Sequence, residues 1–344
     1  MAATTLKPLM SLLLPVQIKM AQIIRIGTRE SELAVWQATQ VKNLLAENGY
    51  EAELVYIKSE GDIDLTTPLY EMGVQGVFTR SLDSALLSKK IDIAVHSMKD
   101  VPTQLAKGLM QAAVLKRGPV KDLLVWKGDW NELSERLGFV NGEWIIPNEY
   151  ASTNSKQLTI ATCSIRRKAQ WLHRFPASHI HHLRGNVNTR LQKLKEEHWD
   201  AAIFAAAGLE RINLRPENSI ELDWMLPAPA QGAIMVVCRA EDHYALDACV
   251  HFNDADTTFC TKIERDFLRA LMGGCSTPIS AYAEMKDDEL HFTGNILSPN
   301  GVQQATYEIT VPVWEAANLG TFAAEEIIRG GGQTIINQIR NDTK

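Results

Sequence analysis

The hydrophobic residues of the chain follow two spacings, one typical of buried strands and one typical of amphipathic helices. Residues 23–27 are mostly apolar, as in a short buried strand. Ser31 is expected to cap a helix that continues to Ala46 and carries apolar side chains at three- and four-residue spacing. Strand-like segments follow at 53–58 and 91–95, with a helical segment at 81–88 between them. This succession predicts an open α/β sheet with helices packed on its faces.

A second unit of the same kind follows. Strands are predicted at 123–126 and 158–162, helices at 164–175 and 189–197, and a strand and turn of small residues at 203–208. Residues 128–157, between the first two strands, are rich in Asn, Gly, Pro and Ser, so we expect an irregular insertion there.

Short internal similarities link the two units. Ile26-Gly27-Thr28, followed by Arg29, Ser31 and Trp36, resembles Ile160-Ala161-Thr162, followed by Ser164, Arg166 and Trp171. Residues 88–94 likewise resemble residues 196–202, each a helix end that enters a strand through an aspartate. Two similar α/β lobes facing one cleft are the simplest explanation. Because the matches are short, coincidence is the alternative.

The pattern changes in the last quarter of the chain. After a Pro-rich linker at 226–232, an apolar strand at 233–238 is expected to return to the first lobe. Beyond it we predict a helix at 258–271, strands at 279–283, 289–297 and 306–311, and helices at 321–329 and 334–340, which together indicate a small α+β domain with an antiparallel sheet. The expected division is a tail at 1–21, a first lobe at 22–117 and 231–250, a second lobe at 118–226, and a C-terminal domain at 255–344.

Composition excludes several classes of protein. The 344 residues carry a net charge of −6, which argues against a protein that binds nucleic acid through bulk positive charge. The five cysteines lack CxxC pairs and metal-ligand spacing, which favours a reducing cytoplasm and predicts no metal site. No apolar run approaches the roughly 20 residues needed to span a bilayer. The apolar residues 9–16 weakly resemble part of a secretory signal but lack its cleavage site, so we expect 1–21 to be a dispensable, disordered tail.

One cysteine lies in an unusual loop, Gly273-Gly274-Cys275-Ser276-Thr277-Pro278. The glycines end the preceding helix and Pro278 prevents it from resuming. Such a position gives a thiol no help from a helix N-terminus, so a reactive Cys275 would need nearby cations. The alternative is that Cys275 is a small buried hydrophobic residue, the common state of a free cysteine.

Basic residues gather where strands end. Thr28, Arg29 and Ser31 follow the first strand at a helix N-terminus, a junction that binds anions in α/β sheets. The second lobe concentrates its own arginines near strand ends: Arg166, Arg167, Arg184, Arg190 and Arg211. Because arginine pairs its donors with carboxylate or phosphate, this set favours a ligand with several anionic groups. The alternative is pairing with surface carboxylates, which the position of Arg166 and Arg167 in a first helical turn disfavours.

Three polar side chains crowd the end of the buried strand at 91–95. Asp100, beside Lys99, is expected to stay ionised and to stabilise a developing cation or transfer a proton. Its alternative is a helix cap or a structural ion pair with Lys99. We expect His96 to be a hydrogen-bonded strand-end histidine and not a base.

Six ordered motifs resemble one family. They are Arg25-Ile26-Gly27-Thr28-Arg29 with Ser31, the segment Ile93 to Pro102 with Ser97-Met98-Lys99-Asp100, Ser164-Ile165-Arg166-Arg167, Leu183-Arg184-Gly185-Asn186-Val187 with Thr189-Arg190, Pro229-Ala230-Gln231-Gly232-Ala233, and Gly273-Gly274-Cys275 with Pro278-Ile279. In this order, from residue 23 onward, they closely resemble the porphobilinogen deaminase (hydroxymethylbilane synthase) family of tetrapyrrole and haem biosynthesis.

The resemblance implies a transferase that deaminates four porphobilinogen molecules and joins them head to tail on a dipyrromethane cofactor attached to Cys275. Hydrolysis then releases hydroxymethylbilane. The implied fold has two α/β lobes like those of periplasmic binding proteins and a third domain that carries the cysteine. Asp100 would contact pyrrole nitrogens and stabilise the electron-poor azafulvene that forms when ammonia leaves. The implied cofactor-binding residues are Ser97, Lys99, Asp100, Ser164, Arg166, Arg167, Arg184, Gly185 and Cys275, and the implied substrate-binding residues are Arg29, Ser31, Arg184, Arg190, Arg211 and Gln231.

The sequence also departs from the family pattern. Glu71 and Gln75 stand in the long 61–78 loop where lysines are frequent, which puts charge contacts from that loop in doubt. We expect a cytoplasmic monomer with porphobilinogen as its small-molecule partner and neither nucleic acid nor a membrane. The rival hypothesis is a two-lobed polycarboxylate-binding module without catalysis, in which Cys275 is merely buried.

Overall fold

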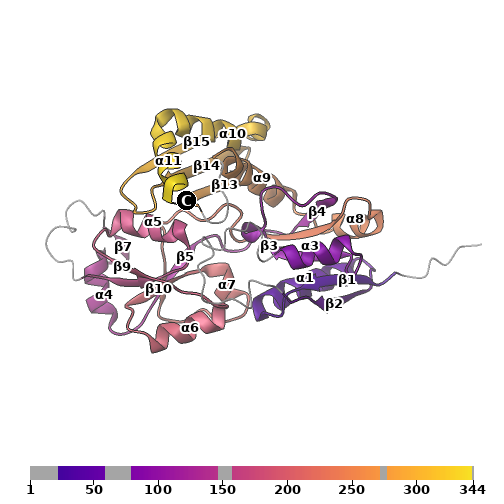
Figure 1. Cartoon of the computed structure of the whole chain (residues 1–344), viewed down its shortest axis with the longest axis horizontal. Coiled ribbons are helices and arrows are strands. Elements are labelled where there is room, and N and C mark those ends of the chain that lie inside the picture. The colour runs from indigo at the N-terminus through magenta and orange to yellow at the C-terminus, as the bar shows by residue number, and fades with distance from the viewer. Residues whose placement is uncertain (1–21, 59–78, 146–156, 272–276, 343–344) are drawn as a thin grey trace, which may run out of the picture.

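A computed structural model describes residues 22–58, 79–145, 157–271 and 277–342 (Figure 1). Two α/β lobes lie side by side, and the C-terminal domain packs across them on one side (Figure 1). None of the helices in these described ranges is long and apolar enough to cross a membrane. The loop at 61–78 and Cys275 lie outside the described residues.

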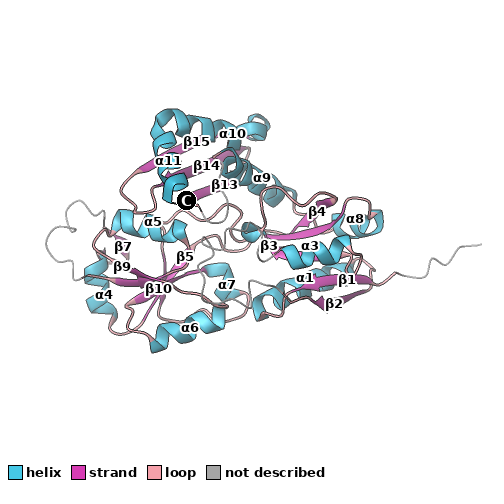
Figure 2. Cartoon of the chain, viewed as in Figure 1, coloured by secondary structure: helices cyan, strands magenta, loops and turns pink. Residues whose placement is uncertain are grey.

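The first lobe contains a five-stranded sheet of order β2-β1-β3-β12-β4. Its strands are β1 (Ile24–Thr28), β2 (Ala52–Tyr56), β3 (Ile93–Ser97), β4 (Leu109–Val114) and β12 (Ile234–Arg239). The helices α1 (Glu32–Glu47), α3 (Arg80–Leu87) and α8 (His243–Val250) pack against it (Figure 2). As predicted, the apolar strand after the linker returns here: β12 lies antiparallel between β3 and β4. Strand β4 was not predicted.

The second lobe contains a five-stranded sheet of order β11-β5-β10-β8-β9. Its strands are β5 (Asp122–Trp126), β8 (Thr159–Ala161), β9 (His179–His181), β10 (Ala201–Ala205) and β11 (Ser219–Glu221). Its helices include α5 (Ile165–Arg174), α6 (Val187–Glu196) and α7 (Ala206–Glu210). Read from the β9 edge, the strands have the same relative directions as those of the first lobe read from β2. The first three strands run parallel, the fourth is antiparallel to the third, and the edge strand is antiparallel to the fourth.

The sequence similarity between the lobes has a physical cause in this topology. Asp92, just before β3, accepts a hydrogen bond from the Arg25 backbone N at 3.0 Å, and its own N donates to the Arg25 carbonyl at 2.9 Å. Asp200, just before β10, makes the same two contacts with Thr159, at 2.7 and 2.9 Å. Each aspartate therefore fixes the start of one parallel strand against its neighbour. The similarity between residues 88–94 and 196–202 reflects this shared structural role and not coincidence.

The C-terminal domain packs helices on one face of the antiparallel sheet β13-β14-β15. Its elements are α9 (Ala255–Ala270), β13 (Ile279–Lys286), β14 (Glu289–Leu297), β15 (Gln304–Pro312), α10 (Leu319–Ile327) and α11 (Gln333–Asp342). Ile263, Phe267 and Phe292 are fully buried between them, and Gly294 leaves the space that the Phe267 ring occupies. The predicted fold class, α/β lobes plus an α+β domain with an antiparallel sheet, is confirmed. The exact domain boundaries stay a prediction.

The expected irregular insertion is partly wrong. Residues 130–137 form helix α4 (Trp130–Leu137), followed by the short pair β6 (Phe139–Val140) and β7 (Glu143–Trp144). Asp129 caps α4 by accepting a hydrogen bond from the Asn131 N at 2.7 Å, and Gly138 ends it with a φ of 65°. Both are local signals that the polar composition of the segment concealed.

A buried ion pair joins the two lobes to the C-terminal domain. The Glu264 carboxylate on α9 has no exposed surface and accepts hydrogen bonds from Arg117 at 2.6 and 3.0 Å. The same carboxylate accepts from the backbone N of Ala230 at 2.6 Å and of Ala283 at 2.8 Å. Because Arg117 and Ala230 lie on the two chain crossings between the lobes, Glu264 ties both crossings to the third domain.

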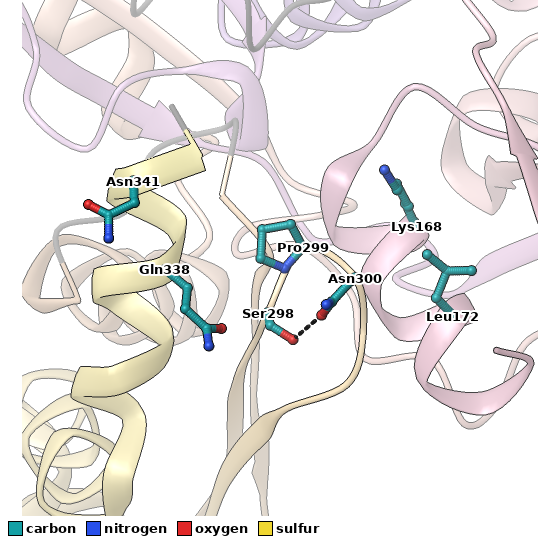
Figure 3. A pocket seen from close by; sticks show the side chains of 7 residues that line it. All are labelled: Lys168, Leu172, Ser298, Pro299, Asn300, Gln338 and Asn341. Carbon is teal, nitrogen blue, oxygen red and sulfur yellow. Dashed lines mark hydrogen bonds between the residues drawn. The ribbon is translucent and has the colours of Figure 1, made fainter. Parts of the chain in front are cut away.

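A surface groove lies where α5, the β14–β15 turn and α11 meet (Figure 3). Lys168 and Leu172 line it from α5, opposite Gln338 and Asn341 of α11. Although Lys168 follows Arg167 in sequence, it is exposed in this groove whereas Arg167 is buried in the lobe. The groove therefore does not contain the predicted site residues.

Candidate active site

Several of the predicted site residues follow the carboxyl ends of inner strands in the two sheets. In the first lobe, β3 ends at Ser97 and a single 3₁₀ turn, Met98–Asp100, follows. In the second lobe, the carboxyl end of β10 at Ala205 pairs with Asp122, the first residue of β5. Carboxyl ends of strands are where open α/β sheets place their ligands.

Asp100 differs from the other site residues in its contacts within the described part of the chain. Its carboxylate makes no hydrogen bond or ion pair with any residue that the structure describes, and it is only partly exposed. The predicted alternatives, a helix cap or a close ion pair with Lys99, are therefore absent among these residues. A half-buried carboxylate without a partner is available to a ligand cation or to a pyrrole N–H.

Lys99 lies at the boundary between the lobes. Its Nζ donates to the Oε1 of Gln231 at 3.3 Å. Burial lowers the pKa of Lys99 to about 8; the positive charges of Arg167 and Arg166 act in the same direction, and Asp100 and Asp122 oppose it. Near neutral pH this amine is cationic, and an added anion would favour its charged form.

Arg166 and Arg167 share one buried carboxylate. Asp122 accepts from Arg166 Nη2 at 2.7 Å and from Arg167 Nη2 at 2.8 Å and Nε at 3.2 Å. Burial alone would raise the pKa of Asp122, but the two guanidinium charges outweigh it and hold that pKa well below its usual range. The sequence disfavoured pairing with surface carboxylates, and the partner found is instead a buried aspartate that β5 brings to the two arginines. The triad retains one net positive charge, and Arg166 Nε has no partner among the described residues.

Arg184 and Arg190 flank a turn at Gly185 and Asn186. Arg184 is buried, and Gly185 has a φ of 116° that favours glycine. The Gly185 carbonyl accepts from Arg190 Nε at 2.8 Å. The Asn186 side chain caps α6 by accepting a hydrogen bond from the Thr189 N at 2.9 Å.

Arg211 spans the two lobes. Its Nη2 donates to the Gly232 carbonyl at 2.6 Å, and its guanidinium carbon lies 5.7 Å from the centre of the Trp36 ring. Burial lowers the pKa of Arg211 to about 10, so the side chain remains charged at neutral pH. It contacts both the crossing segment and helix α1.

The serines differ in what they contact. Ser164 caps α5, accepting from the Arg167 N at 3.4 Å, whereas Ser31 occupies the N-cap position of α1 without a side-chain hydrogen bond to it. The expectation that Ser31 caps this helix is therefore wrong. Ser97 exchanges hydrogen bonds with the Gln37 amide at 2.9 and 3.3 Å.

His96 is not the satisfied histidine that was expected. It is 7% exposed, and its Nε2 has no hydrogen-bond partner among the described residues. Burial, together with the positive charge of Arg29, lowers the pKa of His96 to about 4. The ring is therefore neutral at physiological pH. The effect of Arg29 on this pKa also indicates that Arg29 lies near the end of β3.

Gln231 is fully buried between these groups. Its Nε2 donates to the Val120 carbonyl at 2.7 Å and to Asp122 Oδ1 at 2.9 Å, while its Oε1 accepts from Lys99. Sequence reasoning named Gln231 but missed Asp122. The only local signal for Asp122 was its position at the start of an apolar strand.

Comparison with known proteins settles the family. A family model described as "Porphobilinogen deaminase, dipyromethane cofactor binding domain" matches residues 24–247, and the model of the C-terminal domain of the same family matches residues 258–329. The chain belongs to the porphobilinogen deaminase family. The porphobilinogen deaminase of Pelobacter propionicus is 36% identical over 320 residues, covering 92% of this chain and 97% of that protein. That of Geobacter sulfurreducens is 37% identical, covering 92% and 94%.

Family membership confirms the enzyme class and the cofactor. A porphobilinogen deaminase is a transferase of tetrapyrrole biosynthesis, and the matched region 24–247 is its dipyrromethane-binding domain. The rival hypothesis of a binding module without catalysis is not favoured. Solved structures similar to this chain include an ancestral cationic amino acid solute-binding protein, at 13% identity and a TM-score of 0.39, covering 72% of this chain and 90% of that one. A TM-score this low does not establish a shared fold.

Proposed function

We propose that the chain assembles hydroxymethylbilane from four porphobilinogen molecules at the face where Lys99 and Asp100 meet Arg166 and Arg167. The observation that carries this assignment is the contrast between the Asp100 carboxylate, which makes no hydrogen bond or close ion pair with the described residues, and the cationic groups around it. Porphobilinogen supplies both matching features, because it carries two carboxylates and a pyrrole N–H.

The residues of this face fit a dipyrromethane with its carboxylate side chains. The buried Nε of Arg166 lacks a partner among the described residues, and the Arg166–Arg167–Asp122 triad keeps a net positive charge. Both features are costly in a dry site unless an anion approaches. When bound, the dipyrromethane supplies a pyrrole carbon to which the next unit is joined.

Each group then has a defined task. Asp100 stabilises the positive charge that spreads over a pyrrole when ammonia leaves, because its carboxylate makes no hydrogen bond or close ion pair within the described part of the chain. Lys99, Arg166, Arg167 and Arg184 hold carboxylates, and Arg29, Ser31, Arg190 and Arg211 extend this hold to the growing chain. Cys275, outside the described residues, provides the covalent attachment.

Intact-mass measurement tests this function directly. We expect the purified protein, made in cells that synthesise porphobilinogen, to exceed its polypeptide mass by one dipyrromethane. The Cys275→Ser variant should show the bare polypeptide mass and no turnover, with Cys163→Ser as a matched control that keeps the adduct. A wild-type protein without excess mass would contradict the enzyme assignment.

The arginines should control how far the chain grows. Arg167→Ala or Arg184→Ala removes a buried cation that holds carboxylates, so elongation should stall and turnover should fall about 100-fold, on the scale of two charge-assisted hydrogen bonds. Mass spectra taken during turnover should show enzyme carrying partly extended chains. Arg329→Ala, an exposed arginine of the C-terminal domain, is the matched control. An unchanged turnover number in both variants would remove these residues from the site.

Two finer assignments accompany this proposal. The chain is proposed to work in the cytoplasm, which its free cysteines Cys163, Cys238, Cys249 and Cys260 support. A monomeric state stays a prediction.

A further inference from the structure

Gln231 lies at the point where the two lobes and the C-terminal domain meet. Its side chain has no exposed surface, and its amide contacts Lys99 of the first lobe and Asp122 of the second. Its backbone carbonyl accepts from Arg117 Nε at 2.9 Å. Through Arg117 the same residue is connected to Glu264 of the C-terminal domain.

The backbone around Gln231 is held in an unusual conformation. Ala230 has a φ of 61°, which side-chain-bearing residues rarely adopt, and Gly232 has a φ of 87°. A Cβ on Gly232 would lie 2.6 Å from the Gly118 carbonyl oxygen, so the two chain crossings pass in direct contact here. The Ala230 N is fixed by Glu264 at 2.6 Å. Strain that the surroundings hold in place is typical of positions where a side chain must point in one direction.

The two ends of the amide do different things. The acceptor, Oε1, accepts a hydrogen bond from the Lys99 ammonium. The donor, Nε2, donates to Asp122 Oδ1, the oxygen that also accepts from Arg167. An amide is suited to this position because it has one acceptor and one donor end. A carboxylate would lie at hydrogen-bond distance from the carboxylate of Asp122. An apolar side chain would remove one hydrogen bond from Lys99 and one from Asp122.

We propose that Gln231 is a positioning residue that sets Lys99 of the first lobe against the Asp122-bound arginine pair of the second, and that it acts through these groups instead of contacting substrate. The inference rests on the proposed function, because Lys99 and the arginines are assigned to carboxylate binding there. Through these contacts, Gln231 fixes the distance between the two lobes at the site.

Substitutions at this one position should shift the Lys99 titration in opposite directions. In Gln231→Glu the new carboxylate lies between Lys99 and Asp122; over the pH range in which it is ionised it adds a negative charge beside Lys99, so the Lys99 pKa should rise above its value of about 8. In Gln231→Leu the hydrogen bond to the charged amine is lost, so its pKa should fall. Within the described part of the chain, the charges of Asp100, Asp122, Arg166 and Arg167 that act on Lys99 are the same in both variants.

The test is reductive methylation of the purified holoenzymes over a pH series, with modification of Lys99 followed by peptide mass spectrometry. The midpoint pH reports the Lys99 pKa, and the alkaline limb of the kcat profile should move with it. Gln170→Leu is the matched control: Gln170 is also buried and contacts Leu226 and Ser280, but neither Lys99 nor Asp122. Its midpoint should equal that of the wild type.

Opposite shifts in the two Gln231 variants would support the positioning role, because general loosening of the fold moves both in the same direction. Equal shifts, or none, would overturn it. If Gln231→Leu does not fold, Gln231→Met, which removes the same hydrogen bond with a side chain of similar length, takes its place: a lowered Lys99 midpoint supports the role, and a raised or unchanged one overturns it. Intact mass keeps the two proposals apart: an adduct without a Lys99 shift removes only this inference, whereas absence of the adduct from the wild type removes the proposed function.

Discussion

Replacing Asp100 by asparagine should reduce turnover at least 100-fold while leaving the thermal stability of the protein nearly unchanged. Loss of a charge that stabilises a transition state typically costs a factor of about 10² to 10⁴ in rate. The fold should tolerate the change because the Asp100 carboxylate has no hydrogen bond or ion pair within the described part of the chain. Steady-state kinetics and a thermal melt of the same preparation measure the two effects.

Asp247→Asn provides the control for this experiment. Asp247 is an exposed carboxylate on α8 of the first lobe, far in sequence from every proposed site residue. Its loss removes the same charge from the same lobe, so it should leave turnover within about twofold, as surface substitutions usually do. If the Asp100 variant retains substantial turnover while carrying the cofactor, the carboxylate has no catalytic role.

Elements set by local pattern were predictable from the sequence. Strand β3 and helix α9 appear close to their expected positions, because alternation and helical spacing are local properties of the chain. The paired lobes could be inferred for the same reason: Asp92 and Asp200 each fix a neighbouring strand by a local rule that repeats. Helix α4 was missed although Asp129 and Gly138 mark its ends, because a polar composition outweighed these two signals.

Contacts between distant residues were not predictable. Asp122 lies 44 residues from Arg166 in sequence, and it reaches the arginines only because β5 runs antiparallel to β10. The sequence shows only an acidic residue before a strand and two arginines in a helix. These two features do not determine which residues pair. The motifs therefore predicted the site residues, whereas the contacts of those residues with Asp122 and with one another come only from the structure.

Asp122→Asn should be the most destabilising single substitution proposed here. Removing one partner of a buried ion pair typically costs about 3–5 kcal/mol of unfolding free energy, because the remaining charge is left without compensation. Asp122 has no exposed surface and serves two arginines that are only 4% and 5% exposed, so both lose their counter-charge together. Thermal or denaturant unfolding of the variant measures the loss, and intact mass shows whether it still retains the cofactor.

A second aspartate of the same sheet shows whether burial causes the effect. Asp200 also binds an arginine with both oxygens, but its side chain and that of Arg136 are 24% and 15% exposed, so water can solvate the charge that Asp200→Asn leaves behind. We therefore expect Asp200→Asn to lose less stability than Asp122→Asn, although Asp200 also accepts from Thr159. The reverse order would contradict the view that desolvation makes the triad sensitive.

The pH dependence gives the Asp122 prediction a sign. The folded-state pKa of Asp122 is depressed, so its ionisation contributes stability that is fully present above the unfolded-state pKa of about 3.9. That contribution is lost as the pH falls below this value toward the folded-state pKa. The stability difference between wild type and Asp122→Asn should consequently be constant from about pH 5 to 7 and shrink below about pH 4. A difference that stays constant down to pH 2 would mean that packing around Asp122, and not its charge, holds Arg166 and Arg167 in place.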